Sequence, residues 1–306
     1  MKTAAIFSLV LTLLWLPSRL PAQDRKDHTA SDKFNKEFAL TGNVSRATLA
    51  LYNIMGSVTV QGYSGKNVVV EVTRTLKAAT PELLERGKKE AQPGFDQHGD
   101  SVLVYVAGPQ DSRPQRRNNN GNSYQGRFSD NWTHNNSDRP GYTYSFDFVV
   151  KVPAAMEVRA STVNGGKMLV EDVTGPLQAR NVNGSVTIRN AKSATVAHTV
   201  NGNVDVSYTD APTSPATYHT VNGSITVTYP PNVSGDLHFK SLNGHLYTDF
   251  PQAEILPARV TANQQQDGQG TKYKLKKDTA VRLGKGGVDF RFETVNGNVT
   301  VKKQTR

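Results

Sequence analysis

The chain has 306 residues, no cysteine and a net charge of +10. The missing cysteine excludes disulfide bonds, thiol catalysis and thiolate-bound metal, so the fold must be held by strand pairing and packing. The basic excess favours acidic partners such as anionic glycans, lipopolysaccharide, phospholipid surfaces or extracellular nucleic acid, although a charge that only keeps the surface soluble explains it equally well.

Residues 1–22 have the pattern of a secretory signal peptide. Lys2 supplies a positive start, residues 4–16 are an apolar run, and Pro17 to Ala22 provide a breaker and a small residue before the cut. The apolar run is shorter than the roughly 20 residues of a transmembrane helix. We therefore expect an exported chain without a transmembrane segment, located in the periplasm, on the cell surface or in the medium. Removal of Lys2 and Arg19 leaves 34 basic and 26 acidic residues, a net charge of +8.

A polar lead-in over 23–39 precedes an N-terminal β region over 40–107, in which apolar and polar residues alternate. One short helix interrupts it. Thr80 can cap the helix, Pro81 suits its first turn, and Pro93 with Gly94 ends it after about three turns.

Residues 108–141 are rich in Asn, Arg, Ser and Gly and contain few apolar side chains. This composition predicts a disordered surface loop. Aromatic residues between its arginines could stack on sugars or bases, but a plain disordered insertion explains the same composition.

A repeated Val-Asn-Gly step organises the region 142–303, which we expect to continue the β region of 40–107. The first five asparagines are separated by 19, 18, 21 and 21 residues, close to the shortest repeat periods of solenoid proteins. Each step is flanked by residues that alternate between apolar and polar. The turns are Asn164-Gly165, Asn183-Gly184, Asn201-Gly202, Asn222-Gly223, Asn243-Gly244 and Asn296-Gly297.

The pattern predicts an all-β fold, a parallel β-solenoid or β-helix of short strands with coils of about 20 residues. Glycine and asparagine both tolerate the positive φ of a sharp corner, and stacked asparagines would form a ladder of side-chain hydrogen bonds. An antiparallel sheet in which each Asn-Gly is a hairpin turn is the alternative. The interval between Asn243 and Asn296 should hold one or two irregular coils with an exposed excursion, after which the last Val-Asn-Gly closes the stack.

If the coils are stacked, residues three and five positions before each asparagine share one exposed face. Their basic members would form a contiguous stripe, with Tyr208 or Tyr247 nearby, that binds an anionic polymer more strongly as its histidines protonate near pH 6.5. An ordinary polar face is the alternative, as is a metal held by His198 and His219, which lack a third ligand. The predicted ligand-binding residues are Arg159, Arg180, His198, His219, His238 and Lys240.

The segment Leu51-Tyr52-Asn53-Ile54-Met55-Gly56-Ser57-Val58, the Val152-Pro153-Ala154 step and the serial Val-Asn-Gly units resemble the bacterial putative-adhesin family, over roughly residues 40–303. The resemblance implies an exported β-solenoid domain of unassigned function, for which the family name suggests adhesion. It provides no catalytic residues.

Catalysis by paired carboxylates, as in some β-helix glycan lyases and hydrolases, is a weaker interpretation. The candidate carboxylates fall in different repeat positions and do not collect on one face. We therefore expect no enzyme, no cofactor and no specific nucleic-acid partner. The leading hypothesis is a binding protein for an anionic glycan or cell-surface polymer, and the second is a periplasmic scaffold or sensor that binds an envelope protein through a sheet edge.

Overall fold

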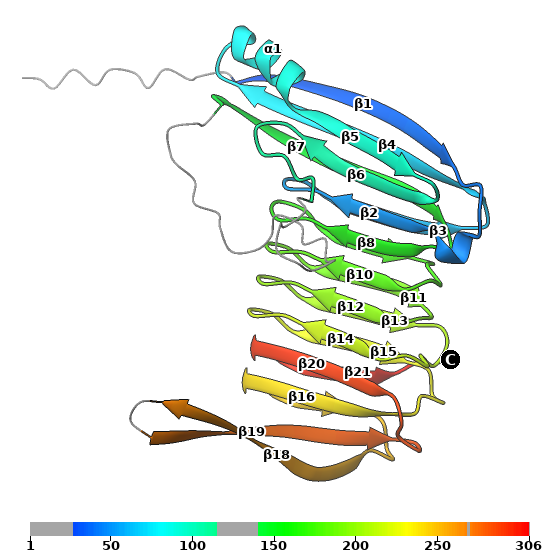
Figure 1. Cartoon of the computed structure of the whole chain (residues 1–306), viewed down its shortest axis with the longest axis vertical. Helices are drawn as coiled ribbons and strands as arrows, with labels where there is room; N and C mark the ends of the chain where they lie inside the picture. Colours follow the sequence, from blue (N-terminus) through cyan, green and yellow to red (C-terminus); the bar gives the residue numbers. More distant parts are fainter. Residues whose placement is uncertain (1–26, 115–139, 268–269, 306) are drawn as a thin grey trace, which may run out of the picture.

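The structure, a computed structural model, describes residues 27–114, 140–267 and 270–305, with backbone alone for 258–267 and 270–278. The predicted signal peptide and most of the predicted loop over 108–141 lie outside the described residues. The described chain is all-β, with one α-helix and two large mixed sheets that do not close into a barrel. The sheets face each other along an elongated body and enclose one hydrophobic core (Figure 1).

Both sheets run from the N-terminal end of the molecule to its C-terminal end. Sheet A has ten strands, in the order β1 (His28–Ala39), β4 (Asn67–Ala78), β7 (Tyr142–Pro153), β3 (Val58–Tyr63), β9 (Met168–Glu171), β11 (Val186–Ala191), β13 (Val204–Tyr208), β15 (Ile225–Tyr229), β21 (Val299–Lys303) and β17 (Leu246–Thr248). Sheet B has eleven strands, in the order β5 (Gln92–His98), β6 (Ser101–Ala107), β2 (Thr48–Tyr52), β8 (Glu157–Ser161), β10 (Leu177–Arg180), β12 (Thr195–His198), β14 (Ala216–His219), β20 (Asp289–Asn296), β16 (Gly235–Asn243), β19 (Gly270–Leu283) and β18 (Glu254–Asp267).

The N-terminal end of the molecule is antiparallel and carries the helix. Strands β1, β4 and β7 pair antiparallel, as do β5 and β6. The predicted helix is confirmed as α1 (Pro81–Glu90), and the side chain of Thr80 accepts a hydrogen bond from the backbone N–H of Leu83, as an N-cap does. The sequence predicted no strand in the polar lead-in over 23–39, but its residues 28–39 form the edge strand β1.

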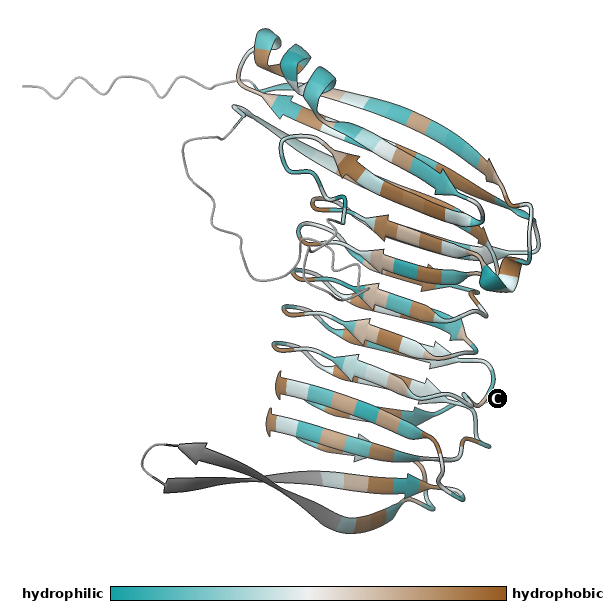
Figure 2. Ribbon diagram, viewed as in Figure 1, coloured by the Kyte–Doolittle hydropathy of each residue, from teal (hydrophilic) through white to brown (hydrophobic). Residues whose placement is uncertain are grey.

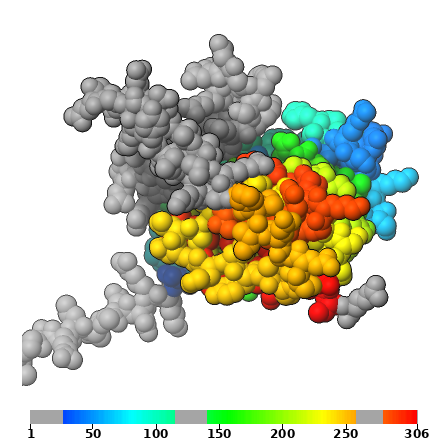
Figure 3. All heavy atoms as spheres, turned by 90° about the horizontal axis from the view of Figure 1, so that it is seen from below, coloured from blue at the N-terminus to red at the C-terminus, as the bar shows by residue number. Residues whose placement is uncertain are grey.

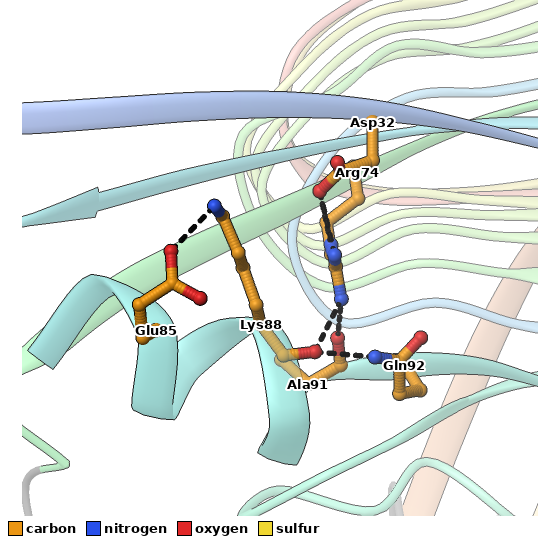
Figure 4. Close-up of polar contacts among 6 residues, drawn as sticks. All are labelled: Asp32, Arg74, Glu85, Lys88, Ala91 and Gln92. Carbon is orange, nitrogen blue, oxygen red and sulfur yellow. Dashed lines mark hydrogen bonds and ion pairs between the residues drawn. The ribbon is translucent and has the colours of Figure 1, made fainter. Parts of the chain in front are cut away.

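A buried arginine joins β1, β4 and α1 (Figure 4). The side chain of Arg74 on β4 is 5% exposed and donates to Asp32 on β1 at 2.6 Å. It also donates to the carbonyl oxygens of Lys88 at 2.9 Å and Ala91 at 2.6 Å, at the C-terminal end of α1. A buried guanidinium needs such partners on all sides, so this contact fixes where the helix lies on the sheet.

From β2 and β3 onward the coils pair in parallel. Strand β10 pairs with β8 and β12, and β11 pairs with β9 and β13, so that Ala179 lies between Ala160 and Ala197. Residues about twenty positions apart in the chain are therefore neighbours in space. The alternative of separate Asn-Gly hairpins is wrong for these coils, because successive asparagines are joined by parallel bridges.

The predicted asparagine ladder is confirmed. The side-chain amide of each asparagine donates to the side-chain oxygen of its neighbour at 2.6–2.9 Å, in the order Asn243, Asn296, Asn222, Asn201, Asn183, Asn164. Gly165 has the expected positive φ of +80°. At Gly202 and Gly223 a different reason for glycine applies, because a Cβ there would overlap the carbonyl of the preceding glycine in the stack.

A second ladder, which the sequence analysis missed, lies two residues before each asparagine. The hydroxyls of Thr199 and Thr220 donate to the carbonyl oxygens of Gly184 and Gly202, both at 2.8 Å. Thr294 repeats this contact one coil further on. Because these hydroxyls are buried, each one satisfies a corner carbonyl that would otherwise lack a donor.

The last repeat does not close the stack, as was expected. Strands β20 and β21 lie inside it, with β20 between β14 and β16 and β21 between β15 and β17. The interval after Asn243 is not a set of irregular coils either. It forms strand β17 and a long antiparallel hairpin of β18 and β19, which ends the C-terminal side of the molecule (Figure 1).

The core follows the alternation of the strands, because buried apolar residues occupy every second position. Figure 2 shows the corresponding alternation of hydrophobic and hydrophilic residues along the strands. In its C-terminal half three tyrosines lie fully inside. The hydroxyl of Tyr218 is 2.7 Å from that of Tyr208 and 3.1 Å from that of Tyr229, so the three form a buried chain of hydrogen bonds between the sheets.

Candidate binding surface on sheet B

The predicted ligand-binding residues all lie on the outer face of sheet B. Residues four and six positions before each coil asparagine are buried, so those three and five positions before it point outward. In the order of the strands, the first outer column is Ser161, Arg180, His198, His219, Glu293, Lys240. The second outer column is Arg159, Gln178, Val196, Thr217, Arg291, His238.

The first column is not the contiguous basic stripe that was expected. Because β20 is inserted between β14 and β16, Glu293 lies between His219 and Lys240. The ammonium of Lys240 is 3.2 Å from the carboxylate of Glu293. An acidic residue therefore separates Lys240 from the other basic residues and neutralises it.

Two members of the second column are also paired with acids. Arg159 donates to Glu157 on the same strand at 2.7 Å, and His238 lies 3.2 Å from Asp289 on β20. Both contacts are partly exposed, so each contributes little to stability. They do reduce the positive charge that this face presents. In its C-terminal half Glu293 and Asp289 pair with Lys240 and His238, while Arg291 stays exposed.

The histidine pair is brought together but does not carry the expected charge. His198 and His219 are opposite each other on β12 and β14, with ring centroids 4.4 Å apart and rings perpendicular. Burial, helped by nearby His219 and Arg180, lowers the pKa of His198 to about 4. Burial also lowers the pKa of His219, against an opposing effect of Glu293. The expectation that the pair protonates near pH 6.5 is therefore wrong.

The histidine pair does not form a metal centre with a third ligand. Within residues 27–114, 140–267 and 270–305, no three His, Asp or Glu side chains are grouped closely enough to hold a metal ion. The ring nitrogen Nδ1 of His219 is buried and has no hydrogen-bond partner.

The N-terminal half of the face combines tyrosine and arginine side chains. Tyr105 on β6, Tyr52 on β2, Ser161 on β8 and Arg180 on β10 follow one another in register across four neighbouring strands. The guanidinium of Arg113 lies over the ring of Tyr105, 4.3 Å from its centroid. We call the group Tyr52, Tyr105, Arg113, Arg159, Arg180 and Ser161 the Arg-Tyr patch.

The side chains of the Arg-Tyr patch lie close together and are partly buried. Burial raises the pKa of Tyr52, while the positive charges of Arg159 and Arg180 act in the opposite direction, so both guanidinium groups lie near the phenol. The hydroxyl of Ser161 is buried and has no hydrogen-bond partner. A buried polar atom without a partner is uncommon, and here it lies between Tyr52 and Arg180 in the register.

Sequence reasoning found Arg159 and Arg180 but missed Tyr52, although a signal was present. The segment 51–58 is an outlying relative of the Val-Asn-Gly units, in which Met55 takes the place of the asparagine. The parallel bridge between Met55 and Asn164 establishes this alignment. Tyr52 stands three residues before Met55 and so belongs to the first outer column. Tyr105 and Arg113 come from strand β6 and the segment after it, which have no repeat to align.

The two tyrosines expected near the stripe do not lie on the outer face of sheet B. Tyr208 is in the core and cannot contribute to the outer face, whereas Tyr247 is exposed on β17 of sheet A. The predicted loop begins with a fixed segment, because the hydroxyl of Ser112 donates to the backbone oxygen of Tyr52 at 2.7 Å.

In the described part of the chain, α1 is neither long nor apolar enough to cross a membrane.

Comparisons with known proteins give only distant structural matches. No family model matches the chain, and no curated protein matches its sequence. A putative cell adhesion protein from Clostridium sporogenes is 10% identical, with a TM-score of 0.44 over 90% of this chain and 100% of that one. A putative adhesin from Bacteroides fragilis is 8% identical, with a TM-score of 0.32 over 89% and 97% of the two chains.

A putative lipid binding protein from Parabacteroides distasonis is 10% identical, with a TM-score of 0.25 over 90% of this chain and 97% of that one. Two of these three structures carry adhesin names, as does the family that the sequence resembles. With TM-scores below 0.5, the function proposed below rests on the residues of this chain alone.

Proposed function

We propose that the protein is an exported, non-catalytic binding protein whose coils form a β-solenoid, and that it holds an anionic polymer at the Arg-Tyr patch. The observation that carries the proposal is the buried, unpartnered hydroxyl of Ser161 between Tyr52 and Arg180. Because the hydroxyl is covered in the unbound chain, an acidic group would have to displace neighbouring side chains, and it would then give that hydroxyl an acceptor. Arg180 would supply the charge, because a guanidinium pairs with carboxylate, sulfate or phosphate through two parallel hydrogen bonds.

The flat, regular face suits a repeating ligand. Neighbouring strands are about 4.8 Å apart, so the aromatic ring of Tyr52 and the guanidinium of Arg180 are offered at fixed intervals across the sheet. Tyr52 supplies an apolar ring beside its polar hydroxyl, which is a combination suited to a sugar ring with an acidic substituent. Acidic sugars fit this arrangement better than neutral ones.

A catalytic role finds less support. The carboxylates considered for catalysis include Glu171, Asp210 and Asp236, which pair with Arg189, Lys192 and Arg282 at 2.8–2.9 Å. A carboxylate that already contacts a basic side chain is poorly placed to transfer a proton to a ligand. These three carboxylates therefore balance charge on the surface.

The experiment compares binding of three soluble polymers to the purified mature chain: polygalacturonate, dextran sulfate and uncharged dextran. We expect both anionic polymers to bind, the uncharged one not to, and Arg180→Gln to weaken binding about tenfold or more, as expected for a charge-assisted hydrogen bond worth about 1.5–3 kcal/mol. Arg189→Gln is the matched control, because it removes the same charge from the outer face of sheet A.

Equal losses in the two variants would show that only the overall charge attracts the polymers, and the patch would then have no special role. Binding of uncharged dextran as strong as that of dextran sulfate would also contradict the proposal. Raising the salt concentration should weaken binding to the wild type, since exposed charges are screened beyond about 8–10 Å at physiological ionic strength.

A further inference from the structure

The C-terminal end of the stack is stepped. Sheet A ends at β17, whereas sheet B continues for two more strands, β19 and β18, beyond β16 of the same coil. Figure 3 looks onto this end, where the yellow and orange residues that precede the last repeat form the near surface. One strand position beside β17 is therefore left open, next to a sheet that extends past it.

The backbone of β17 is ready to pair on its open side. Val299 donates to the carbonyl of His245 at 2.9 Å, and Asp249 donates to the carbonyl of Val301. Because the polar groups of a strand alternate in direction, the odd-numbered residues bond β21, and Leu246 and Thr248 turn their N–H and C=O groups to the free edge. These four groups form the usual template for an added strand.

The corner beside β17 is incomplete in the same way. Asn243 donates to the side-chain oxygen of Asn296 at 2.8 Å, in the same direction as the inner asparagines of the ladder donate to their neighbours. Its own side-chain oxygen accepts no hydrogen bond from any described residue, although in the inner rungs that oxygen always has a donor. A further asparagine in the same phase would complete the ladder.

Exposed apolar side chains gather at this end. Among the described residues, four large hydrophobic side chains are exposed, and three of them belong to the final coil and its hairpin. Leu242 and Ile255 are each 77% exposed, and Tyr247 is 52% exposed. An open edge with apolar neighbours favours association and is normally covered in soluble proteins.

A second copy of this chain cannot complete the stack end to end. Its N-terminal end has no open coil to offer, since α1 and the antiparallel strands β1 and β5 occupy it. The first corner is already used on both sides, because Met55 bridges to Asn164 and accepts a hydrogen bond from Phe146.

We propose that the open edge of β17 accepts an extended strand of another protein, parallel to β17, with an Asn-Gly corner followed by apolar residues at alternate positions. The corner would continue the asparagine ladder from Asn243. The strand would bond Leu246 and Thr248, and its apolar residues would face the part of sheet B that carries Ile255. This surface is separate from the Arg-Tyr patch and does not depend on its function.

The test uses the purified mature chain and a labelled peptide with the sequence of residues 220–229, which has the required corner and alternation. We expect saturable binding, measured by fluorescence anisotropy. Thr248→Pro removes an N–H that faces the free edge and should weaken binding about tenfold or more, the equivalent of one or two hydrogen bonds. A peptide with alanine in place of its asparagine should bind more weakly than the original.

Asn243→Ala and Asn164→Ala form the matched pair. Each removes one rung bond at one end of the ladder, but only Asn243 adjoins the open edge. We expect the first substitution to weaken peptide binding and the second to leave it unchanged. Absence of peptide binding, or equal binding by the wild type and Thr248→Pro, would overturn the proposal. So would self-association of the chain in sedimentation experiments that Thr248→Pro abolishes, because the occupant would then be a second copy.

Discussion

Replacement of Tyr218 by phenylalanine tests whether the buried tyrosine chain stabilises the stack. The change keeps the ring and removes only the central hydroxyl. Tyr208 retains a second partner in Thr195, whereas Tyr229 is left in the core without a hydrogen bond. Two hydrogen bonds are lost, and one buried hydroxyl is left unsatisfied, which costs about 2–4 kcal/mol of unfolding free energy.

Tyr229→Phe is the internal comparison. It removes the hydroxyl at the end of the chain and leaves Tyr218 bonded to Tyr208, so we expect a loss of only about 1 kcal/mol. Urea unfolding followed by circular dichroism measures both values, provided that the slope m is unchanged. A loss in Tyr218→Phe equal to or smaller than that in Tyr229→Phe would refute the reasoning, because the central hydroxyl would then contribute no more than the terminal one.

Two further substitutions test electrostatic contacts. Arg74→Lys keeps the charge but cannot reach Asp32 and both helix carbonyls together, so we expect a loss of about 1–3 kcal/mol in urea unfolding, while Arg86→Lys at an exposed ion pair changes little. The pKa of His198 is lowered to about 4 in the folded state, so the unfolded state binds more protons between pH 4 and 6.5. Stability should therefore fall as the pH drops through this window, and His198→Gln should make the thermal midpoint less dependent on pH.

The coil geometry could be predicted from the sequence because one short motif fixes several features together. From Gly184 onward the glycine of each Asn-Gly corner lets the neighbouring backbone approach closely, and the asparagine extends the ladder. The alternation around the motif then decides which side chains are buried, and Val186, Ile188 and Ala179 all lie in the core as their positions require. Helix α1 was predictable for a similar reason, since Thr80 and Pro81 act locally.

The order of the coils could not be predicted in the same way. Each coil presents nearly the same edge, with an asparagine, a glycine carbonyl and apolar residues at fixed positions, so several stacking orders satisfy the same local rules. The chain places its last repeat inside the stack because the hairpin of β18 and β19 occupies the position beside β16. That hairpin has no Val-Asn-Gly step, and its antiparallel pairing was therefore not visible in the repeat.

The insertion of β20 also decides the charge of the candidate surface. Had the coils followed chain order, Lys240 would lie beside His219 and would extend the positive column from Arg180. Instead Glu293 takes that position and pairs with Lys240, and Asp289 on the same strand meets His238. The acids of one inserted strand thus pair with Lys240 and His238, but the same strand leaves Arg291 exposed on this face. At the N-terminal half, the guanidinium of Arg180 has no acidic partner among the described residues. Of these two guanidinium groups, only that of Arg180 lies next to Ser161 in the register, so we expect an anionic polymer to bind beside Tyr52.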